Sequence, residues 1–137
     1  MKMIVRNMKD IPGFEITARG AQGVTIKWLT EKRLGGDNYL HNFAVRFFEI
    51  KPGGFWLPGH VHAWDEAFVI LSGRMAFTSG EETKEVSSGD VVYVPANEPH
   101  HGRNPSDKEP LTFMCVIGCV GDKSNCVGPE KDIEKVC

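Results

Sequence analysis

The sequence predicts an all-β domain built as a sandwich or a barrel, and three observations support this fold class. First, the 137 residues include 15 glycines and 8 prolines, a turn-rich composition that favours many short strands over a helical bundle. Second, six to eight short segments rich in β-branched and aromatic residues are separated by turn signals every 8 to 12 residues. Third, no helical pattern of useful length precedes the polar tail at 129–136.

The expected elements follow one another in a regular order. Segments 23–30 and 42–50 are predicted strands because β-branched and aromatic residues dominate them, and the sequence KPGG at 51–54 predicts a turn. A short extended segment around 60–62 comes next. Further strands are expected at 67–71, 74–79, 85–88, 91–95 and 111–120, with a polar hairpin at 80–84 and a loop from 96 to about 109. The residues before 23 are expected to form an N-terminal arm or edge strand.

Charge and hydropathy exclude several classes of partner. The chain has 16 basic and 18 acidic residues, a net charge of −2, and no run of five or six like charges, so we expect no nucleic-acid or membrane partner. The longest apolar stretch, 111–121, is about half the length that a bilayer requires. Charged residues from Lys2 to Asp10 occupy the place where a signal peptide needs an apolar run. We therefore expect a cytoplasmic protein.

Four of the five histidines fall in two pairs, and the first pair belongs to a spaced motif. Gly54, His60, His62, Glu66 and Gly73 follow the spacing G-x5-H-x-H-x3-E-x6-G. On a strand, where the side-chain period is two, His60 and His62 point to the same face and form a chelating pair. Glu66 at the start of the next strand can add an anionic oxygen; it could instead act as a base beside the metal, or lie at the surface.

The second pair belongs to a similar motif. Gly89, Pro95, His100 and Asn104 follow the spacing G-x5-P-x4-H-x3-N, which places a third imidazole after a turn and a strand end. Three histidines and one glutamate form a mixed nitrogen and oxygen set that suits Fe, Mn, Ni, Cu or Zn.

These two motifs resemble those of the cupin superfamily. The segment GFWLPGHVHAWDEAFVILSG matches the first cupin motif without departure. The segment GDVVYVPANEPHHGRN departs from the second motif once, where Asn97 replaces the usual glycine and is expected in the left-handed conformation that asparagine tolerates. The motifs span residues 54 to 104, and strand-rich flanks extend the resemblance over about 20 to 120.

The resemblance implies a double-stranded β-helix, which is a small jelly-roll barrel. Within the superfamily, the patterns HxHxWxE and F-x-C resemble the small single-domain monocupins of the cupin 2 conserved-barrel type. The whole chain, 1–137, is then expected to be one cupin domain with an N-terminal arm and a cysteine-containing C-terminal tail. One divalent transition metal (Mn, Fe, Zn or Ni) is expected inside one mouth of the barrel, held by His60, His62, Glu66 and His100.

Other residues have both a functional and a purely structural interpretation. Arg46, inside an apolar strand, could point into the barrel as an anion clamp or extend outward. Tyr93 and Phe113 could line the cavity or simply pack. Cys115 could be an oxidisable, pocket-lining thiol, but a small buried hydrophobic residue is favoured. His101 is expected at the surface, opposite His100.

The four cysteines, at 115, 119, 126 and 137, lie in the last 23 residues and lack the C-x2-C pairs of zinc and iron–sulfur sites. Free thiols are the expectation, and a disulfide between Cys119 and Cys126, or between Cys126 and Cys137, is the alternative. A second metal centre is not favoured.

The expected function is that of a metal-dependent enzyme acting on a small, anionic or chelating ligand. Dioxygenase-type oxidation of an enolate, diol or thiol ranks first, and isomerase, lyase or decarboxylase chemistry on a sugar acid or hydroxy acid ranks second. No general base has a distinctive motif, so the metal is expected to carry much of the catalysis and the catalytic residues stay unassigned, with Glu66 as a candidate. A non-catalytic metal- or metabolite-binding module is the third hypothesis. A homodimer formed through N-terminal strands is expected as well.

Overall fold

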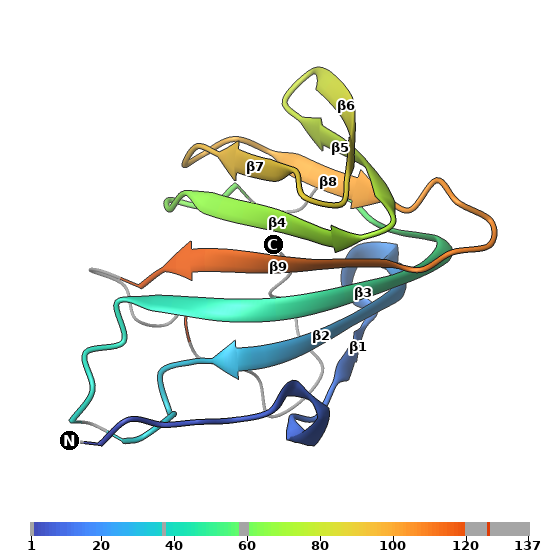
Figure 1. Cartoon of the computed structure of the whole chain (residues 1–137). Helices are drawn as coiled ribbons and strands as arrows, with labels where there is room; N and C mark the ends of the chain where they lie inside the picture. The colour runs from blue at the N-terminus through green and yellow to red at the C-terminus, as the bar shows by residue number, and fades with distance from the viewer. Residues whose placement is uncertain (1, 37, 58–60, 120–125, 127–137) are drawn as a thin grey trace.

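The protein is built from antiparallel strands, so the all-β prediction is confirmed (Figure 1). A computed structural model describes residues 2–36, 38–57, 61–119 and 126. Two single 3-10 turns, η1 (Met8–Asp10) and η2 (Ala18–Gly20), precede and follow the first strand. No helix in the described ranges is long and apolar enough to cross a membrane. The strands are β1 (Phe14–Ile16), β2 (Gln22–Thr30), β3 (Phe43–Trp56), β4 (Glu66–Ser72), β5 (Arg74–Ser79), β6 (Glu82–Ser87), β7 (Val91–Val94), β8 (His100–Arg103) and β9 (Leu111–Gly118).

Strand β3 joins the two halves of one curled sheet. Its first part, residues 43–50, pairs with β2 on one side and with β9 on the other; β9 pairs with β4, and β4 with β7 at the edge. Its last residues, 55–56, pair with β8, which pairs with β5, and β5 pairs with β6 at the opposite edge. Figure 1 shows β4, β9, β3 and β2 side by side, with the β5–β6 hairpin beyond them. This is the expected jelly-roll arrangement.

The turn predicted at 51–54 is a bend within β3, so that prediction is wrong. Gly53 has a φ of 74°, a left-handed value that glycine adopts without steric cost. A Cβ on Gly54 would lie only 2.7 Å from the backbone oxygen of Gln22, because the strands are in close contact there. The two glycines let one strand change direction without ending, and this carries the chain from one half of the sheet to the other.

Strand β8 lies where the sequence predicted a loop. Its four residues show no apolar alternation, and only pairing makes them a strand: His100 lies opposite Ser79 of β5, and Arg103 lies opposite Phe55 of β3. The polar hairpin also differs from the prediction, since β6 begins at Glu82 rather than at 85. Both differences arise because pairing with a neighbour is a tertiary effect that local composition does not reveal.

The core fills the inside of the curled sheet with aromatic rings. Phe48 and Phe113 are stacked, with ring centroids 4.9 Å apart. Phe77 meets Trp56 and Phe68 edge-on at centroid distances of 6.3 and 5.0 Å. These rings form an apolar wall directly beneath the side chains of the site described below.

The last strand is tied to the connection between β2 and β3. Cys119 and Cys126 form a disulfide, so the expectation of free thiols is wrong for this pair. The Cys119 amide donates to the oxygen of Asn42, and the Cys126 oxygen accepts from the amide of Lys32. Cys115 is buried and forms no disulfide. Cys137 and the polar tail at 129–136 lie outside the described residues.

Candidate metal centre

Three of the predicted metal ligands meet at one mouth of the barrel. Glu66 is the first residue of β4, His100 is the first residue of β8, and His62 lies in the connection between β3 and β4. One ligand atom from each, two imidazole nitrogens and a carboxylate oxygen, lie within 4.8 Å of one another. Donors that surround one ion at about 2.0–2.2 Å are themselves separated by roughly 3 to 4 Å, so this spacing suits a shared ion. The fourth predicted ligand, His60, lies outside the described residues.

The two ring nitrogens of His100 have different environments. Nδ1 lies 3.0 Å from the backbone oxygen of Glu98, and because a carbonyl only accepts, Nδ1 carries the hydrogen. Nε2 lies 3.1 Å from Oε2 of Glu66, yet it has no hydrogen-bond partner in the part of the chain that the structure describes. In the neutral ring, Nε2 therefore turns a lone pair toward an anionic oxygen. Such a contact requires a cation between the two atoms, either a proton or a metal ion.

The electrostatics of this pair agree with that view. Burial lowers the pKa of His100, but the adjacent Glu66 carboxylate and the Glu98 carbonyl raise it by more, so the pKa of His100 lies above its ordinary value. Burial raises the pKa of Glu66, but His100, Arg46 and His62 lower it by more, so Glu66 is held as a carboxylate. An ionised carboxylate beside imidazole nitrogens is a donor set that Fe, Mn, Ni or Zn accepts.

Glu66 is 3% exposed, which rules out the surface-charge interpretation. Its Oε1 accepts a hydrogen bond from Nε1 of Trp64 at 3.2 Å. Oε1 also lies 3.8 Å from Nε2 of His62 and 4.0 Å from Nη2 of Arg46. The carboxylate is therefore fixed from one side by an indole while both of its oxygens face nitrogen atoms of neighbouring residues.

His62 does not lie on a strand, so the argument from strand periodicity fails for this segment. Its ring instead stacks on Trp64 with centroids 4.6 Å apart and planes inclined by 12°. Its backbone oxygen accepts from the amide of Asn97, which has a φ of 65°. The left-handed conformation expected for Asn97 is thus confirmed, and the loop before β8 is tied to the loop that carries His62.

Sequence reasoning assigned no role to Trp64, which contacts two of the three candidate ligands. Its indole N–H holds Glu66, and its ring face holds His62. The signal was present in the spacing, because a residue two positions before Glu66 and two after His62 can reach both. Partners of this kind orient metal ligands and fix their protonation.

Arg46 and Cys115 lie deeper in the same interior. Arg46 is 2% exposed, so of its two interpretations the structure supports the inward one. Its Nη2 lies 3.0 Å from Sγ of Cys115, and Sγ lies 3.9 Å from Oε2 of Glu66. Cys115 is a fully buried thiol, as favoured from the sequence, that also contacts two charged residues. Phe113 is fully buried in the ring cluster.

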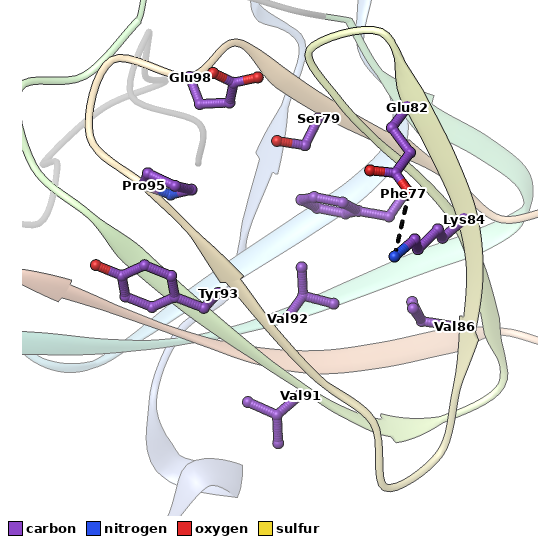
Figure 2. Close-up of a pocket in the computed structure, with 10 residues that line it drawn as sticks. All are labelled: Phe77, Ser79, Glu82, Lys84, Val86, Val91, Val92, Tyr93, Pro95 and Glu98. Carbon is purple, nitrogen blue, oxygen red and sulfur yellow. Dashed lines mark ion pairs between the residues drawn. The ribbon is translucent and has the colours of Figure 1, made fainter.

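Tyr93 lies outside the barrel interior, contrary to the suggestion that it lines that cavity. It is 64% exposed, and its hydroxyl donates to Oδ2 of Asp65 at 2.6 Å, a bond that raises its pKa. It lines a groove of about 430 Å³ between the edge strands β6 and β7, which Figure 2 shows with Phe77 at its base and the Glu82–Lys84 ion pair on one wall. His101 is half-buried rather than exposed, and burial lowers its pKa.

Comparisons with known proteins agree with the fold and with the motifs. A family model described as a cupin domain matches residues 46–117, which is more than half of the chain. The structure of the polyketide cyclase RemF from Streptomyces resistomycificus is similar, with a TM-score of 0.74 and 26% identity over 86% of this chain and 80% of that one. A predicted oxalate decarboxylase from Thermotoga maritima is similar in fold, with a TM-score of 0.72 and 23% identity over 85% of this chain and 98% of that one.

The curated relatives share shorter stretches. An uncharacterized protein of Streptomyces coelicolor is 54% identical over 39 residues, which are 28% of this chain and 37% of that protein. The chain thus matches well under half the length of the curated relatives that it resembles.

Proposed function

We propose that this chain, which belongs to the cupin domain family, is a metal-dependent enzyme that acts on a small oxygenated substrate able to chelate the metal. The observation that carries the proposal is the His62–Glu66–His100 cluster, in which the buried Nε2 of His100 faces a carboxylate that is held ionised. A bound divalent ion would supply a Lewis acid, and iron or manganese would add redox chemistry. The site has a carboxylate and two imidazoles to hold such an ion, with His60 as a fourth expected ligand.

The protein's own residues determine how such a site would work. Trp64 orients Glu66 and His62 from outside the cluster. Phe77 lies against the ring of His100 with centroids 6.0 Å apart, and Phe68 meets the same ring edge-on at 5.8 Å. These aromatic walls exclude water from the inner side of the cluster, which strengthens electrostatic interactions there. A substrate would approach from the side of His62, whose side chain is 18% exposed while that of Glu66 is 2% exposed.

Oxidation of the dioxygenase type is the reaction we favour, because the mixed nitrogen and oxygen set suits iron or manganese. Isomerase, lyase or decarboxylase chemistry and a non-catalytic binding role are the alternatives that the test must separate. The first measurement is metal analysis of protein purified without chelator. Iron would favour oxygen chemistry, zinc or nickel would favour Lewis-acid chemistry, and manganese would allow both.

The decisive comparison uses variants of the cluster. His62→Ala and His100→Ala should abolish stoichiometric metal binding and any turnover, whereas His101→Ala, a neighbouring histidine outside the cluster, should retain both. The wild type is then assayed with enediol, hydroxy-acid and thiol substrates. Oxygen uptake would indicate oxidation, whereas product formation without oxygen would indicate isomerase, lyase or decarboxylase chemistry. Turnover that persists in metal-free His62→Ala protein would refute the proposal, and a metal-loaded protein inactive on every class would favour the binding role.

We also propose that the protein forms a homodimer through its N-terminal strands. Met3 and Val5 are 88% and 83% exposed, and β7 presents Val91 and Tyr93 at a sheet edge. Exposed apolar residues in the N-terminal arm and an unprotected strand edge at β7 each favour pairing with a second copy of the chain. Size-exclusion chromatography with light scattering should give the dimer mass, and deletion of residues 1–7 should give a monomer; a monomeric full-length chain would exclude this assembly.

A further inference from the structure

The groove between β6 and β7 is a second place where a small molecule could bind, separate from the metal centre. Its volume of about 430 Å³ lies within the range of small-molecule pockets. The candidate ligands His62, Glu66 and His100 do not line it. The two strands are the opposite ends of the strand order, and Figure 2 shows that they diverge from the turn at 88–90. The groove therefore widens away from that turn.

Apolar side chains line the groove near the turn, and polar side chains surround its wide end. Phe77, which is 4% exposed, forms the base, and the half-buried Val86 and Val92 lie on the two walls. Figure 2 shows the polar residues at the wide end: Ser79, Glu82 and Glu98. This gradient suits an amphipathic molecule, because its apolar body would leave water while its polar group stays at the rim.

The charges that line the groove are unbalanced toward the acidic side. Two lining residues are acidic, Glu82 and Glu98, and one is basic, Lys84, which leaves one negative charge. Nζ of Lys84 lies 3.2 Å from Oε1 of Glu82, so these two compensate each other. The Glu98 side chain has no hydrogen bond or ion pair among the residues that the structure describes. A carboxylate that only accepts hydrogen bonds is therefore left for a ligand.

The position of Glu98 is fixed by its surroundings. A Cβ on Gly80 would touch Oε1 of Glu98, so the carboxylate lies directly over the turn between β5 and β6. The Gly80 amide also donates to the oxygen of Pro99 at 2.8 Å, which ties the loop that carries Glu98 to the same turn. The carboxylate is thus held at the wide end of the groove rather than extended into solvent.

We propose that this groove binds a small amphipathic amine. Its apolar body lies on Phe77, Val86 and Val92, and its ammonium group donates to the carboxylate of Glu98. The ring face of Phe77 also favours a cation over an anion, because its quadrupole is negative on the face. This inference goes beyond the proposed function, since neither a metal ion nor a candidate metal ligand takes part in the binding.

The test compares three probes that share a phenyl ring and differ in charge: 2-phenylethylamine, 2-phenylethanol and phenylacetate. The full-length protein is titrated in EDTA and followed by amide NMR shifts, so that no metal-bound ligand contributes. We expect the amine to bind with a dissociation constant of about 1 mM or tighter. The alcohol should bind about fivefold more weakly and phenylacetate more weakly still. The largest shifts should fall in β6, in β7 and around Glu98.

Variants of the charged residues test what selects the amine. Glu98→Gln should weaken amine binding about fivefold and change alcohol binding by less than about twofold. Glu81→Gln is the matched control, because Glu81 is exposed and does not line the groove. Lys84→Met should strengthen amine binding, since it removes the competing cation and frees Glu82.

A second pair of variants tests the apolar part of the groove. Val92→Thr keeps the shape of the side chain but makes it polar, so it should weaken binding of all three probes by about threefold. Val45→Thr, at a half-buried valine of β3 that does not line the groove, should match the wild type. Circular dichroism establishes that each variant folds.

Three results would overturn the inference. One is equal affinity for the amine and phenylacetate, or a preference for phenylacetate, because Glu98 would then not determine selectivity. Another is the absence of saturable binding by all three probes, and the third is a set of shifts confined to the barrel mouth around His62. If Glu98→Gln does not fold, Lys84→Met decides, since weaker amine binding in that variant contradicts the proposed charge balance. None of these results bears on metal binding, which is measured separately.

Discussion

Nε2 of His100 lies 3.1 Å from Oε2 of Glu66, while Nδ1 of the same ring is engaged by the backbone oxygen of Glu98. The hydrogen bond to the main chain therefore fixes the tautomer of His100, with the hydrogen on Nδ1. The contact between Nε2 and the Glu66 carboxylate is then favourable only when a cation lies between them. Without metal that cation is a proton, which makes the pair an imidazolium and a carboxylate. Metal and proton consequently compete for the same position.

The metal-free protein should show a specific pH dependence of stability. Glu66, whose pKa is below its ordinary 4.5, contributes stability that is present above that value and is lost as the pH falls through the lowered pKa. His100, whose pKa is above its ordinary 6.5, contributes stability that is fully present below that value and is lost as the pH rises through the raised pKa.

The free energy of unfolding of the wild type minus that of His100→Gln should therefore be largest between about pH 4.5 and 6.5 and should shrink above this range. Urea unfolding in EDTA at pH 5, 6, 7 and 8 measures this difference. A difference that grows toward pH 8 would contradict the assigned interaction.

Trp64 should control metal affinity without being a ligand. Trp64→Phe keeps an aromatic face for His62 but removes the N–H that holds Oε1 of Glu66, so affinity should fall about tenfold. Trp64→Ala removes both contacts and should lower it further. Trp56→Phe is the matched control, because Nε1 of Trp56 has no hydrogen-bond partner among the residues that the structure describes. Competition titrations against a chelator would show whether Trp64→Phe and Trp56→Phe differ as expected.

A side chain at Gly54, the second glycine of the bend in β3, should destabilise the fold. A Cβ on Gly54 would lie 2.7 Å from the Gln22 oxygen and 3.0 Å from the Lys51 oxygen, both backbone atoms. Gly54→Ala should therefore lower the free energy of unfolding by about 1 to 3 kcal/mol. Gly118→Ala, at a position with nothing within 4 Å of the added carbon, should be close to neutral. Equal stability of the two variants in denaturant unfolding would mean that the strands separate at Gly54 without cost.

The disulfide should stabilise the end of the last strand. Cys119 and Cys126 are seven residues apart, and closing a loop of that length contributes about 2 kcal/mol through the unfolded state. A reducing agent should lower the melting temperature of the wild type and leave that of a Cys119→Ser, Cys126→Ser double variant unchanged. Reduction without any thermal shift would show that the bond makes no such contribution.

Most of the fold could be predicted from the sequence because its strands carry their own signals. Alternating apolar residues and glycine turns are signals contained in the local sequence. They predicted the positions of five strands to within about two residues: β2, β4, β5, β7 and β9. Strand β8 carries no such pattern, since its residues are polar and become a strand only by pairing with β5 and β3. The bend at 51–54 misled the prediction because glycines permit a turn and a bend equally well.

The site was partly predictable for a similar reason. Spacing identified His62, Glu66 and His100, which the fold brings within 4.8 Å. Spacing could not decide the direction of Arg46, because an arginine in an apolar strand can point either way until the partners across the barrel are known. Those partners, Glu66 and Cys115, come from β4 and β9, whose places around the barrel local composition does not reveal.

Two of the candidate metal ligands lie in different parts of the sheet, and this has a consequence for folding. Glu66 belongs to the part of the sheet that β9, β4 and β7 form, whereas His100 belongs to the part formed by β8, β5 and β6. Apart from the bent strand β3, these two parts are joined by the connections β4–β5 and β6–β7 and by backbone hydrogen bonds of Ile70 with Gly89 and Asp90. An ion bound by both residues would cross-link them, so metal uptake and closure of the barrel would be thermodynamically linked, and the chain would resist heat better as the free metal concentration rises.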